Sequence, residues 1–246
     1  MTRVAVFGAN GRMGGEVCRA VQLTPGLELV AAVDVGDPHV EAEKADVVVD
    51  FTHPDAVMDN LKWCIDHDKH AVVGTTGFTP ERLETLRGWL ADKPGVGITI
   101  ASNFSIGAVL LMHFAKKAAE YYPSVEIIEL HHPQKADAPS GTAATTAQMI
   151  AEGRAAAGLG EVPDATEIDP DGARGATVDG IHVHAVRLQG LIAHQEVLFG
   201  QDGETLTLRH DSMNRASYMP GVMMAVQAVE EHPGLTMGIE ALLGLE

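Results

Sequence analysis

Residues 131–143 read HHPQKADAPSGTA, a short stretch that contains two histidines, a lysine and two hydroxyl side chains. Histidine transfers protons near neutral pH, and histidine and lysine together can hold an anion. Histidines are also common metal ligands. The stretch therefore allows two kinds of site, one that binds a metal ion and one that binds an anion and supplies it with protons.

The metal site is the weaker alternative. His131 and His132 are adjacent at the end of an expected strand, so their side chains start toward opposite faces. A zinc site also needs further ligands at characteristic spacings. Glu129 and the HVH of His182 and His184 could supply them, but the default interpretation of those two histidines is a packed strand face. We expect no metal site.

An anion site explains more of the stretch. Ser140 is a good N-cap for the Ala-rich segment that follows, and Gly141 and Thr142 would present first-turn amides to a carboxylate. Lys135 and the histidines add charge and protons. Alone, Ser140 could simply cap a helix and Lys135 could simply be solvated. Together they predict a carboxylate site with its own proton donors.

A glycine-rich loop near the N-terminus suggests a dinucleotide-binding site. VAVFGANGRMGGEV places Gly8, Gly11 and Gly14 directly after a strand and at the opening of a helix. Glycine allows a tight turn and close approach to a pyrophosphate, whose charge then meets the helix amides. The spacing GxxGxxG varies the usual fingerprint and could be only a structural turn. Asp34 ends the next strand about 20 residues later, where an acidic residue would bond the ribose 2'-hydroxyl.

The same loop bears on the choice of cofactor. Asp34 should repel a 2'-phosphate, and Val35 supplies no compensating charge, whereas Arg12 could contact one. We therefore expect NADH as cofactor and keep NADPH as the alternative. The expected cofactor contacts of this loop are Gly8, Ala9, Asn10, Gly11, Arg12 and Met13.

The first hundred residues predict a Rossmann-like domain. Short β-branched runs at 3–8, 27–34, 45–52, 70–76 and 97–102 alternate with helical patterns at 13–23, 54–67 and 80–92, two of them opened by proline. Strands of this kind form a parallel, doubly wound α/β sheet. Three strands end in DFTHP, GTTGF and ASNFS, and ligands of such sheets bind outside these carboxyl ends.

The later residues predict a second, α+β domain. A helix at 106–122, a strand from 124 to 132 and a helix at 142–157 precede a long loop at 158–180. Runs at 181–188, 193–200 and 204–212 alternate at period 2, the last two joined by QDG, and indicate a mixed or antiparallel sheet. A helix at 220–232 would return to the first domain. We expect one domain from residues 1–105 and 216–246, and a second from 106–215.

Composition excludes several classes of protein. Lys plus Arg number 17 against 34 Asp plus Glu, a formal net charge of -17, which argues against nucleic-acid binding. No apolar run is long enough to span a membrane, and no signal peptide precedes the first strand. Cys18 and Cys64 are interpreted as buried thiols in a reducing compartment. We expect a cytoplasmic protein that binds neither nucleic acid nor membrane.

The chain resembles a known enzyme family. ELHHPQKADAPSGTA is similar to the E-x-HH-x-x-K-x-DAPSGTA signature of the bacterial 4-hydroxy-tetrahydrodipicolinate (dihydrodipicolinate) reductases. GANGRMG, DFTHP, GTTGF, ASNFSIG, VRLQGLIAHQEV and RHDSMNRASYMPGV also resemble that family's blocks, in its order, across essentially the whole chain. Two departures are Val35, where some members carry Arg, and RLQGLIAHQE, an altered form of a more Gly-rich stretch.

The resemblance implies NAD(P)H-dependent reduction of 4-hydroxy-tetrahydrodipicolinate, a small cyclic imine dicarboxylate, with loss of water, in lysine and diaminopimelate biosynthesis. His131 matches the acid/base and Lys135 a proton donor near the ring nitrogen. The expected substrate contacts are His132, Ser140, Gly141 and Thr142. Further expected cofactor contacts are Gly74, Thr75, Thr76, Ala101, Ser102, Asn103 and Phe104. The family also implies a homotetramer assembled through the sheet of the second domain, which would serve substrate binding and oligomerisation.

Two other functions fit the first domain. One is a different imine-type amino-acid dehydrogenase, such as an aspartate dehydrogenase, which the HH-K-PSGT block does not favour. The other is a non-enzymatic dinucleotide-sensing protein, which leaves Lys135 and the paired histidines without a purpose.

Overall fold

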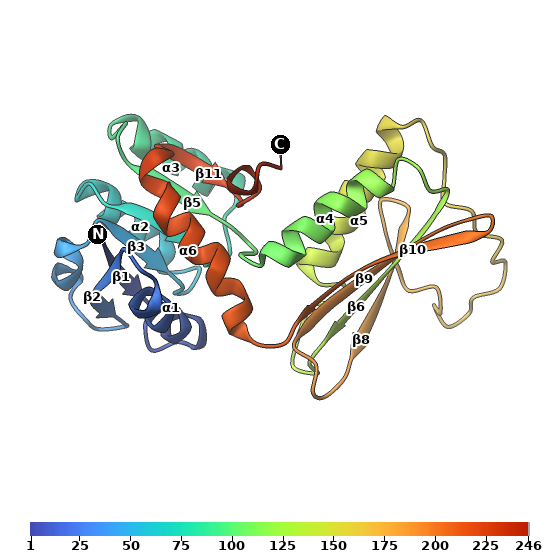
Figure 1. The fold of residues 1–246 in the computed structure, drawn as a ribbon, viewed down its shortest axis with the longest axis horizontal. Coiled ribbons are helices and arrows are strands. Elements are labelled where there is room, and N and C mark those ends of the chain that lie inside the picture. Colours follow the sequence, from blue (N-terminus) through green and yellow to red (C-terminus); the bar gives the residue numbers. More distant parts are fainter. Residues whose placement is uncertain (246) are drawn as a thin grey trace. The chain divides into compact units, whose positions relative to one another are not determined.

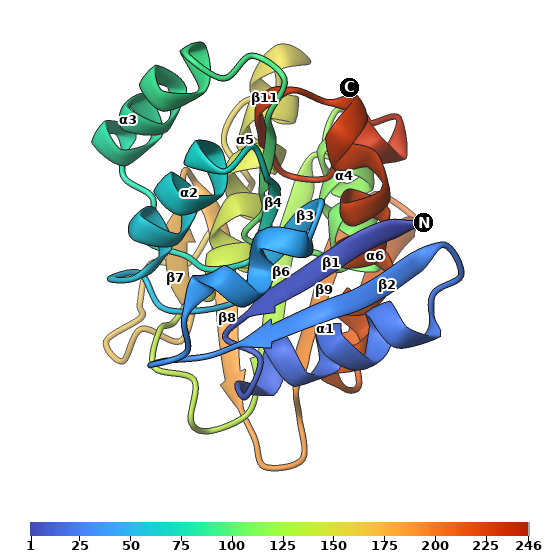
Figure 2. The same ribbon diagram turned by 90° about the vertical axis from the view of Figure 1, so that its left-hand side faces the viewer.

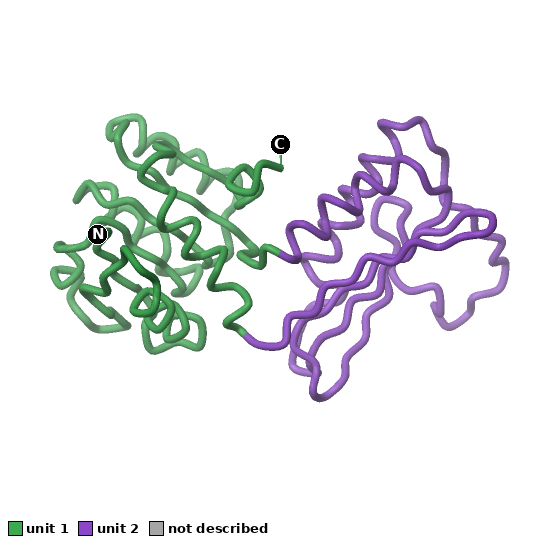
Figure 3. The backbone as a smooth tube through the Cα atoms, viewed as in Figure 1, with its two compact units in different colours: residues 1–106, 215–246 green, residues 107–214 purple. Residues whose placement is uncertain are grey.

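The protein folds into two compact units in a computed structural model that describes residues 1–245 (Figure 1). Unit 1 consists of Met1–Ile106 and Arg215–Glu246, and unit 2 of Gly107–Asn214 (Figure 3). The chain therefore leaves unit 1 once, completes unit 2, and returns to unit 1 near its C-terminus. No helix among the described residues is long and apolar enough to cross a membrane.

Unit 1 contains a six-stranded parallel sheet in the order β11-β5-β4-β3-β1-β2. The strands are β1 (Thr2–Phe7), β2 (Leu27–Val33), β3 (Val47–Asp50), β4 (His70–Val73), β5 (Gly97–Ile100) and β11 (Gly234–Met237). The chain runs outward from β1 in both directions, as Figure 2 shows for β1, β2 and β3. The predicted parallel, doubly wound fold is confirmed.

Helices connect these strands across both faces of the sheet. They are α1 (Arg12–Leu23), α2 (Val57–Asp66), α3 (Pro80–Ala91) and α6 (Met219–Ala228), with short 3-10 turns at His39–Lys44, Arg215–Tyr218, Val229–Glu231 and Ala241–Leu243. Leu61 of α2 and Leu86 of α3 pack in one core cluster with Ala5 and Phe7 of β1. Val4 and Val6 point to the opposite face and are equally buried. Because residues on both faces of β1 are buried, the sequence of this strand contains a continuous apolar run, VAVF.

The structure corrects several predicted boundaries in unit 1. The strands predicted at 45–52 and 70–76 end at Asp50 and Val73, because the residues that follow turn away to form the loops of the sheet edge. Pro54 lies outside α2, which begins at Val57, whereas Pro80 does open α3. The sixth strand, β11, was not predicted, since four partly exposed residues carry no clear period.

Unit 2 contains a mixed sheet in the order β10-β9-β6-β8-β7. The strands are β6 (Ser124–His131), β7 (Ala176–Val178), β8 (Ile181–Arg187), β9 (Ala193–Gln201) and β10 (Glu204–Ser212). Only β6 and β8 pair in parallel, and the other neighbours are antiparallel. The predicted mixed sheet is confirmed, including the hairpin at QDG, where Gly203 adopts a positive φ of 86°.

Two helices cover one face of this sheet (Figure 1). They are α4 (Ile106–Ala118) and α5 (Gly141–Ala156). Leu111 of α4 and Ile150 of α5 pack against Ile127 of β6 and Val197 of β9 in a second hydrophobic core. Because strand side chains alternate, every second residue of β6 faces this core, and Glu129 occupies such a position.

Three predictions for this part of the chain and for the cysteines need correction. β7 lies inside the predicted loop at 158–180. The sequence does indicate it, because Asp179-Gly180 is a residue pair that favours a two-residue hairpin turn, and this turn joins Val178 of β7 to Ile181 of β8. The helix predicted at 106–122 ends at Ala118. Both thiols are free, but only Cys64 is buried, where burial raises its pKa; Cys18 is half-buried.

Candidate active site

The glycine loop after β1 is closed on itself by backbone contacts. Gly8 has a φ of 77°, and a Cβ there would lie 2.5 Å from the Phe51 carbonyl oxygen. The Gly11 amide donates to the Gly8 carbonyl over 3.0 Å. A Cβ on Gly14 would collide with that same carbonyl. Gly8 and Gly14 are therefore required by close backbone packing, which brings the loop against the start of α1.

The N-terminus of α1 is suited to an anion. Its N-cap is Gly11, which has no side chain to bond the first-turn amides. No acidic side chain lies in the first turn, so the positive end of the helix dipole is not neutralised there. Arg12 and Asn10 are exposed beside it, while Ala9 is buried and Met13 partly buried. These residues fit the pyrophosphate predicted for this loop.

Asp34 directly follows β2, beside the glycine loop. Its Oδ2 accepts a hydrogen bond from the Asn10 amide over 2.6 Å, and its Oδ1 accepts one from the Val35 amide over 2.8 Å. The side chain expected to bond a ribose therefore also ties β2 to the loop. Val35 is fully exposed. Its side chain offers no charge to a 2'-phosphate.

A buried carboxylate that sequence reasoning gave no role joins two other loops of this sheet edge. Asp50 ends β3 and is 1% exposed. Its Oδ1 accepts from the Thr52 amide at 3.0 Å, the Thr52 hydroxyl at 2.8 Å and the Thr75 hydroxyl at 2.7 Å. Its Oδ2 accepts from Asn60 Nδ2 at 2.7 Å. Asp50 thus holds the loops after β3 and β4 in one arrangement.

The predicted cofactor residues after β4 and β5 lie at the same edge of the sheet. Gly74 packs under the Phe51 ring, where a Cβ would not fit, and Thr76 is exposed. The Ala101 amide donates to the Val73 carbonyl at 3.1 Å. Ser102 is exposed, Asn103 accepts from the Ser105 amide at 2.8 Å, and the buried Phe104 ring packs near Phe51.

Unit 2 contains a compact charge cluster at the end of β6. Glu129 is fully buried, and its carboxylate accepts two hydrogen bonds from Arg187, at 2.8 and 2.9 Å. It also accepts from His131 Nδ1 at 2.5 Å and from the Ser140 amide at 3.2 Å. Arg187 reaches this position because β8 pairs with β6 in register, His131 opposite Arg187.

The protonation states in this cluster follow from its contacts. Burial alone would raise the pKa of Glu129, but hydrogen bonds from Arg187 and His131 lower it below its ordinary value. Burial lowers the pKa of His131 below its ordinary value, and the hydrogen bond that Nδ1 donates to Glu129 opposes this without cancelling it. His131 is therefore neutral near pH 7, with its proton on Nδ1 and a lone pair on Nε2.

Lys135 lies four residues beyond His131, in the loop that leads to α5. Its Nζ donates to the Asp137 carboxylate at 2.8 Å. This hydrogen bond is the main reason that the pKa of Asp137 lies below its ordinary value, and the backbone amide of Gly141 adds to the effect. Lys135, the predicted proton donor, and the Gly141 amide, a predicted carboxylate contact, therefore both bond the carboxylate of Asp137.

The other predicted substrate residues surround the start of α5. Ser140 caps the helix as predicted, since its hydroxyl accepts from the Ala143 amide at 3.2 Å. The Thr142 carbonyl accepts from the Thr146 hydroxyl at 2.7 Å. His132 follows the end of β6 and is half-buried, and its Nδ1 is buried without a hydrogen-bond partner in the structure. His132 therefore has unused bonding capacity beside this loop.

The remaining histidines singled out in the sequence lie on the opposite face of the sheet. His184 bonds Glu126 at 2.5 Å, and His182 lies 3.3 Å from Asp164. Arg174 bonds both carboxylates. Within residues 1–245 no group of three or more His, Cys, Asp or Glu side chains is arranged to hold a metal ion.

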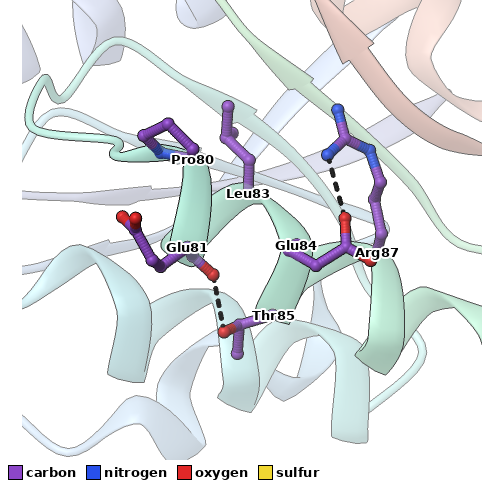
Figure 4. A pocket seen from close by; sticks show the side chains of 6 residues that line it. All are labelled: Pro80, Glu81, Leu83, Glu84, Thr85 and Arg87. Atoms are coloured by element: carbon purple, nitrogen blue, oxygen red, sulfur yellow. Dashed lines mark hydrogen bonds and ion pairs between the residues drawn. The ribbon is translucent and has the colours of Figure 1, made fainter.

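A surface concavity on unit 1 lies apart from these residues. Its lining comes from α3 alone: Pro80, Glu81, Leu83, Glu84, Thr85 and Arg87 (Figure 4). Two of its charged side chains bond each other within the helix, Arg87 to Glu84 at 3.4 Å. It contains no predicted site residue, and it is not a candidate for the chemistry.

Comparison with known proteins identifies the family. A family model described as Dihydrodipicolinate reductase, N-terminus, matches residues 2–104, and one described as Dihydrodipicolinate reductase, C-terminus, matches residues 107–243. The chain belongs to the dihydrodipicolinate reductase family. The predicted resemblance is confirmed.

Individual relatives agree over the full length. Proteins named 4-hydroxy-tetrahydrodipicolinate reductase from Cutibacterium acnes and Thermobifida fusca are 65% and 63% identical, with 100% of both chains covered. A solved dihydrodipicolinate reductase from Paenisporosarcina sp. TG-14, with dipicolinate bound, is 43% identical with a TM-score of 0.85, covering 98% of this chain and 99% of that one.

Proposed function

We propose that the protein catalyses the NAD(P)H-dependent reduction of 4-hydroxy-tetrahydrodipicolinate to tetrahydrodipicolinate, with loss of water, in lysine and diaminopimelate biosynthesis. Members of its family are NAD(P)H-dependent oxidoreductases. Relatives that match the chain over its whole length are named for this activity. The observation that carries the proposal is the grouping of His131, Lys135 and the start of α5 within one loop.

The sheet edge of unit 1 supports the assignment of the cofactor. The glycine loop has no room for a Cβ at Gly8 or Gly14, and the uncapped start of α1 provides amides for a pyrophosphate. Asp34 would bond a ribose hydroxyl beside them, and the segments at 74–76 and 101–104 would line the path of the dinucleotide. When bound, the reduced nicotinamide supplies the hydride.

The proton chemistry is assigned to the loop after β6. His131 Nε2 would accept and return a proton as acid/base, since Nδ1 is bonded to Glu129. Lys135 Nζ would donate to the ring nitrogen of the cyclic imine. His132, Ser140, Gly141 and Thr142 would contact the substrate carboxylates. Expelling water and protonating the ring both require donors, and this loop contains two.

We propose that the protein prefers NADH to NADPH. Asp34 would repel a 2'-phosphate, and the exposed Val35 beside it carries no compensating charge. Arg12 is exposed at the start of α1 and could contact a 2'-phosphate. NADPH therefore stays in the proposal as a second cofactor, with a higher KM.

The sheet of unit 2 supports a homotetramer. Ile128 and Leu130 of β6, Val186 of β8 and Leu198 of β9 lie on the sheet face opposite to α4 and α5, and all four are partly exposed. An apolar face of this kind can pair with a second copy. Light scattering of the purified protein would test this proposal, and a monomer at micromolar concentration would contradict it.

The activity is tested by NADH absorbance. The protein is added to fresh aspartate semialdehyde and pyruvate together with a dihydrodipicolinate synthase, then without the synthase, and then with NADPH. We expect loss of absorbance that depends on the synthase. No loss with either cofactor, from protein that still binds NADH, would contradict the proposal and favour the dinucleotide sensor. Oxidation of aspartate with NAD would favour an amino-acid dehydrogenase instead.

A further inference from the structure

Glu129 is unusual because it is an acidic side chain in the hydrophobic core position of a strand. Val125 and Ile127 precede it on the same face of β6, and all three are at most 1% exposed. Removing a carboxylate from water costs several kcal/mol unless hydrogen bonds and opposite charge replace the water. A stable fold alone would be served better by an apolar residue, so the retained carboxylate calls for a functional reason.

The contacts of Glu129 cover both oxygen atoms. Arg187 binds it in a bidentate fork, and the Ser140 amide at the start of α5 adds a third donor. Arg187 is itself fixed, since it also donates to the carbonyls of Asp137 and Val186, at 2.7 and 2.9 Å. This carboxylate is therefore held in place independently of its fourth donor, His131 Nδ1.

We infer that Glu129 is the positioning residue of the proposed active site, which fixes the imidazole of His131 through Nδ1 and leaves Nε2 as the nitrogen that meets the substrate. This inference rests on the proposed role of His131 as acid/base. Arg187 neutralises Glu129, so the carboxylate stays ionised and does not take the proton of Nδ1. The arrangement is a base oriented by a third group, itself anchored by a cation.

The charges that face His131 set the direction of the expected effect. Glu129 on β6 favours the imidazolium, while Lys135 in the following loop and Arg187 on β8 disfavour it. Changing Glu129 to Gln keeps the size and one acceptor but removes the favourable charge. The titration of His131 should then move to lower pH, by about one unit or more for loss of an opposite charge in direct contact.

The chain offers a matched control on the same strand. Glu126 also bonds one histidine, His184, at 2.5 Å and one arginine, Arg174, but on the other face of the sheet. Glu126→Gln therefore removes a carboxylate that is also paired with a histidine and an arginine, although its side chain is 28% exposed, without touching His131. Any effect that is specific to Glu129 should be absent from this variant.

The titration is measured without substrate. Diethyl pyrocarbonate modifies neutral imidazole, and peptide mass spectrometry of the whole protein gives the modification rate of His131 against pH. We expect the midpoint for His131 to fall by about one unit in Glu129→Gln and to stay unchanged in Glu126→Gln. Equal midpoints in the unsubstituted protein and Glu129→Gln would overturn the inference.

Kinetics provide the second measurement. Glu129→Gln should lower kcat by about tenfold or more, and should move the pH profile of kcat/KM to lower pH. In a His131→Gln background, the same change should cost less than about twofold, because the residue it positions is gone. An equal loss in both backgrounds would mean that Glu129 acts only on the fold, and would also overturn the inference.

The test still decides the question if the Glu129→Gln variant does not fold or if the unsubstituted protein is inactive. If Glu129→Gln does not fold because Arg187 is left unpaired, the double variant Glu129→Gln with Arg187→Gln removes both charges, and the His131 midpoint should still fall. If the unsubstituted protein shows no reductase activity, the proposed function fails. The modification experiment then still decides whether Glu129 controls His131.

Discussion

Replacing Asp50 by Asn should both destabilise unit 1 and weaken cofactor binding. Asp50 accepts four hydrogen bonds while almost fully buried, three of them at Oδ1 and one, from Asn60, at Oδ2. Asn keeps the shape of the side chain. The Asn side chain would have an NH2 group in place of Oδ2, and this group would face the NH2 group of Asn60. Two donors cannot bond each other, so the side-chain amide of Asn60 would have to rotate by 180°.

The size of the effect follows from these contacts. Bonds to an ionised group contribute about 1.5–3 kcal/mol each and neutral ones about 0.5–1.5, so four bonds lose roughly 4 kcal/mol in total. The charge of Asp50 no longer has to be buried, which offsets part of this loss. We therefore expect the free energy of unfolding to fall by about 2–3 kcal/mol.

Cofactor affinity should fall as well. Thr52 and Thr75 belong to the loops after β3 and β4, and Asp50 is their shared acceptor. Loops that are less well ordered must lose conformational freedom on binding, and a cost of about 1.4 kcal/mol raises Kd tenfold. We expect the Kd of NADH, measured by calorimetry, to rise by about tenfold.

Urea unfolding at constant pH measures the first effect, and Asp46→Asn is the matched control. Asp46 immediately precedes β3 and pairs with Arg3 at the surface, at 2.5 Å, so its loss should change stability much less. A change in unfolding free energy no larger for Asp50→Asn than for Asp46→Asn would refute the reasoning about burial. A loss of stability with unchanged Kd would refute the link to the cofactor.

Three other substitutions, the last with a matched control, test individual groups. Lys135→Ala should lower kcat by about 10²-fold or more with NADH binding intact, and a kcat near that of the unsubstituted protein would show that Lys135 is not the donor. Asp34→Ala should relax the preference for NADH, and an unchanged ratio of kcat/KM for NADH and NADPH would count against its ribose contact. Gly14→Ala should abolish dinucleotide binding because its Cβ meets the Gly8 carbonyl, whereas Gly15→Ala, with ordinary 3.7 Å contact to the Ala9 carbonyl, should bind normally.

Most of the fold was predictable because the strands of unit 1 are short and apolar on both faces. The last four residues of β1 and all of β3 are buried, and such runs between helical patterns indicate a parallel sheet. β11 was not predictable in this way. Its four residues at the edge of the sheet are mostly half-buried, and they pair with β5 only because the chain returns from unit 2.

The candidate site was predictable where its chemistry lies within one loop. His131, Lys135 and Ser140 are neighbours in sequence, and the predicted cap at Ser140 is present. The catalytic and binding roles of all these residues stay predictions. Glu129 could have been recognised, since the alternation of β6 places it on the core face, where an acidic residue needs a partner. Its partner Arg187 lies 58 residues later and is brought to it only by the pairing of β6 with β8.

The carboxylates beside the proposed ligand groups fall into two classes by burial. Glu129 and Asp50 are at most 1% exposed, so releasing their donors would leave a buried charge unpaired, at a cost no weak ligand could offset. Asp137 is 58% exposed at its side chain, and its bond to Lys135 is a surface ion pair of small net worth. We therefore expect a bound substrate to release both groups from Asp137, Lys135 to the ring nitrogen and the Gly141 amide to a substrate carboxylate, while Glu129 keeps His131. A structure with a dicarboxylate bound should show the Lys135–Asp137 contact broken and the His131–Glu129 contact unchanged, and the reverse would show that burial does not decide which contacts are exchanged.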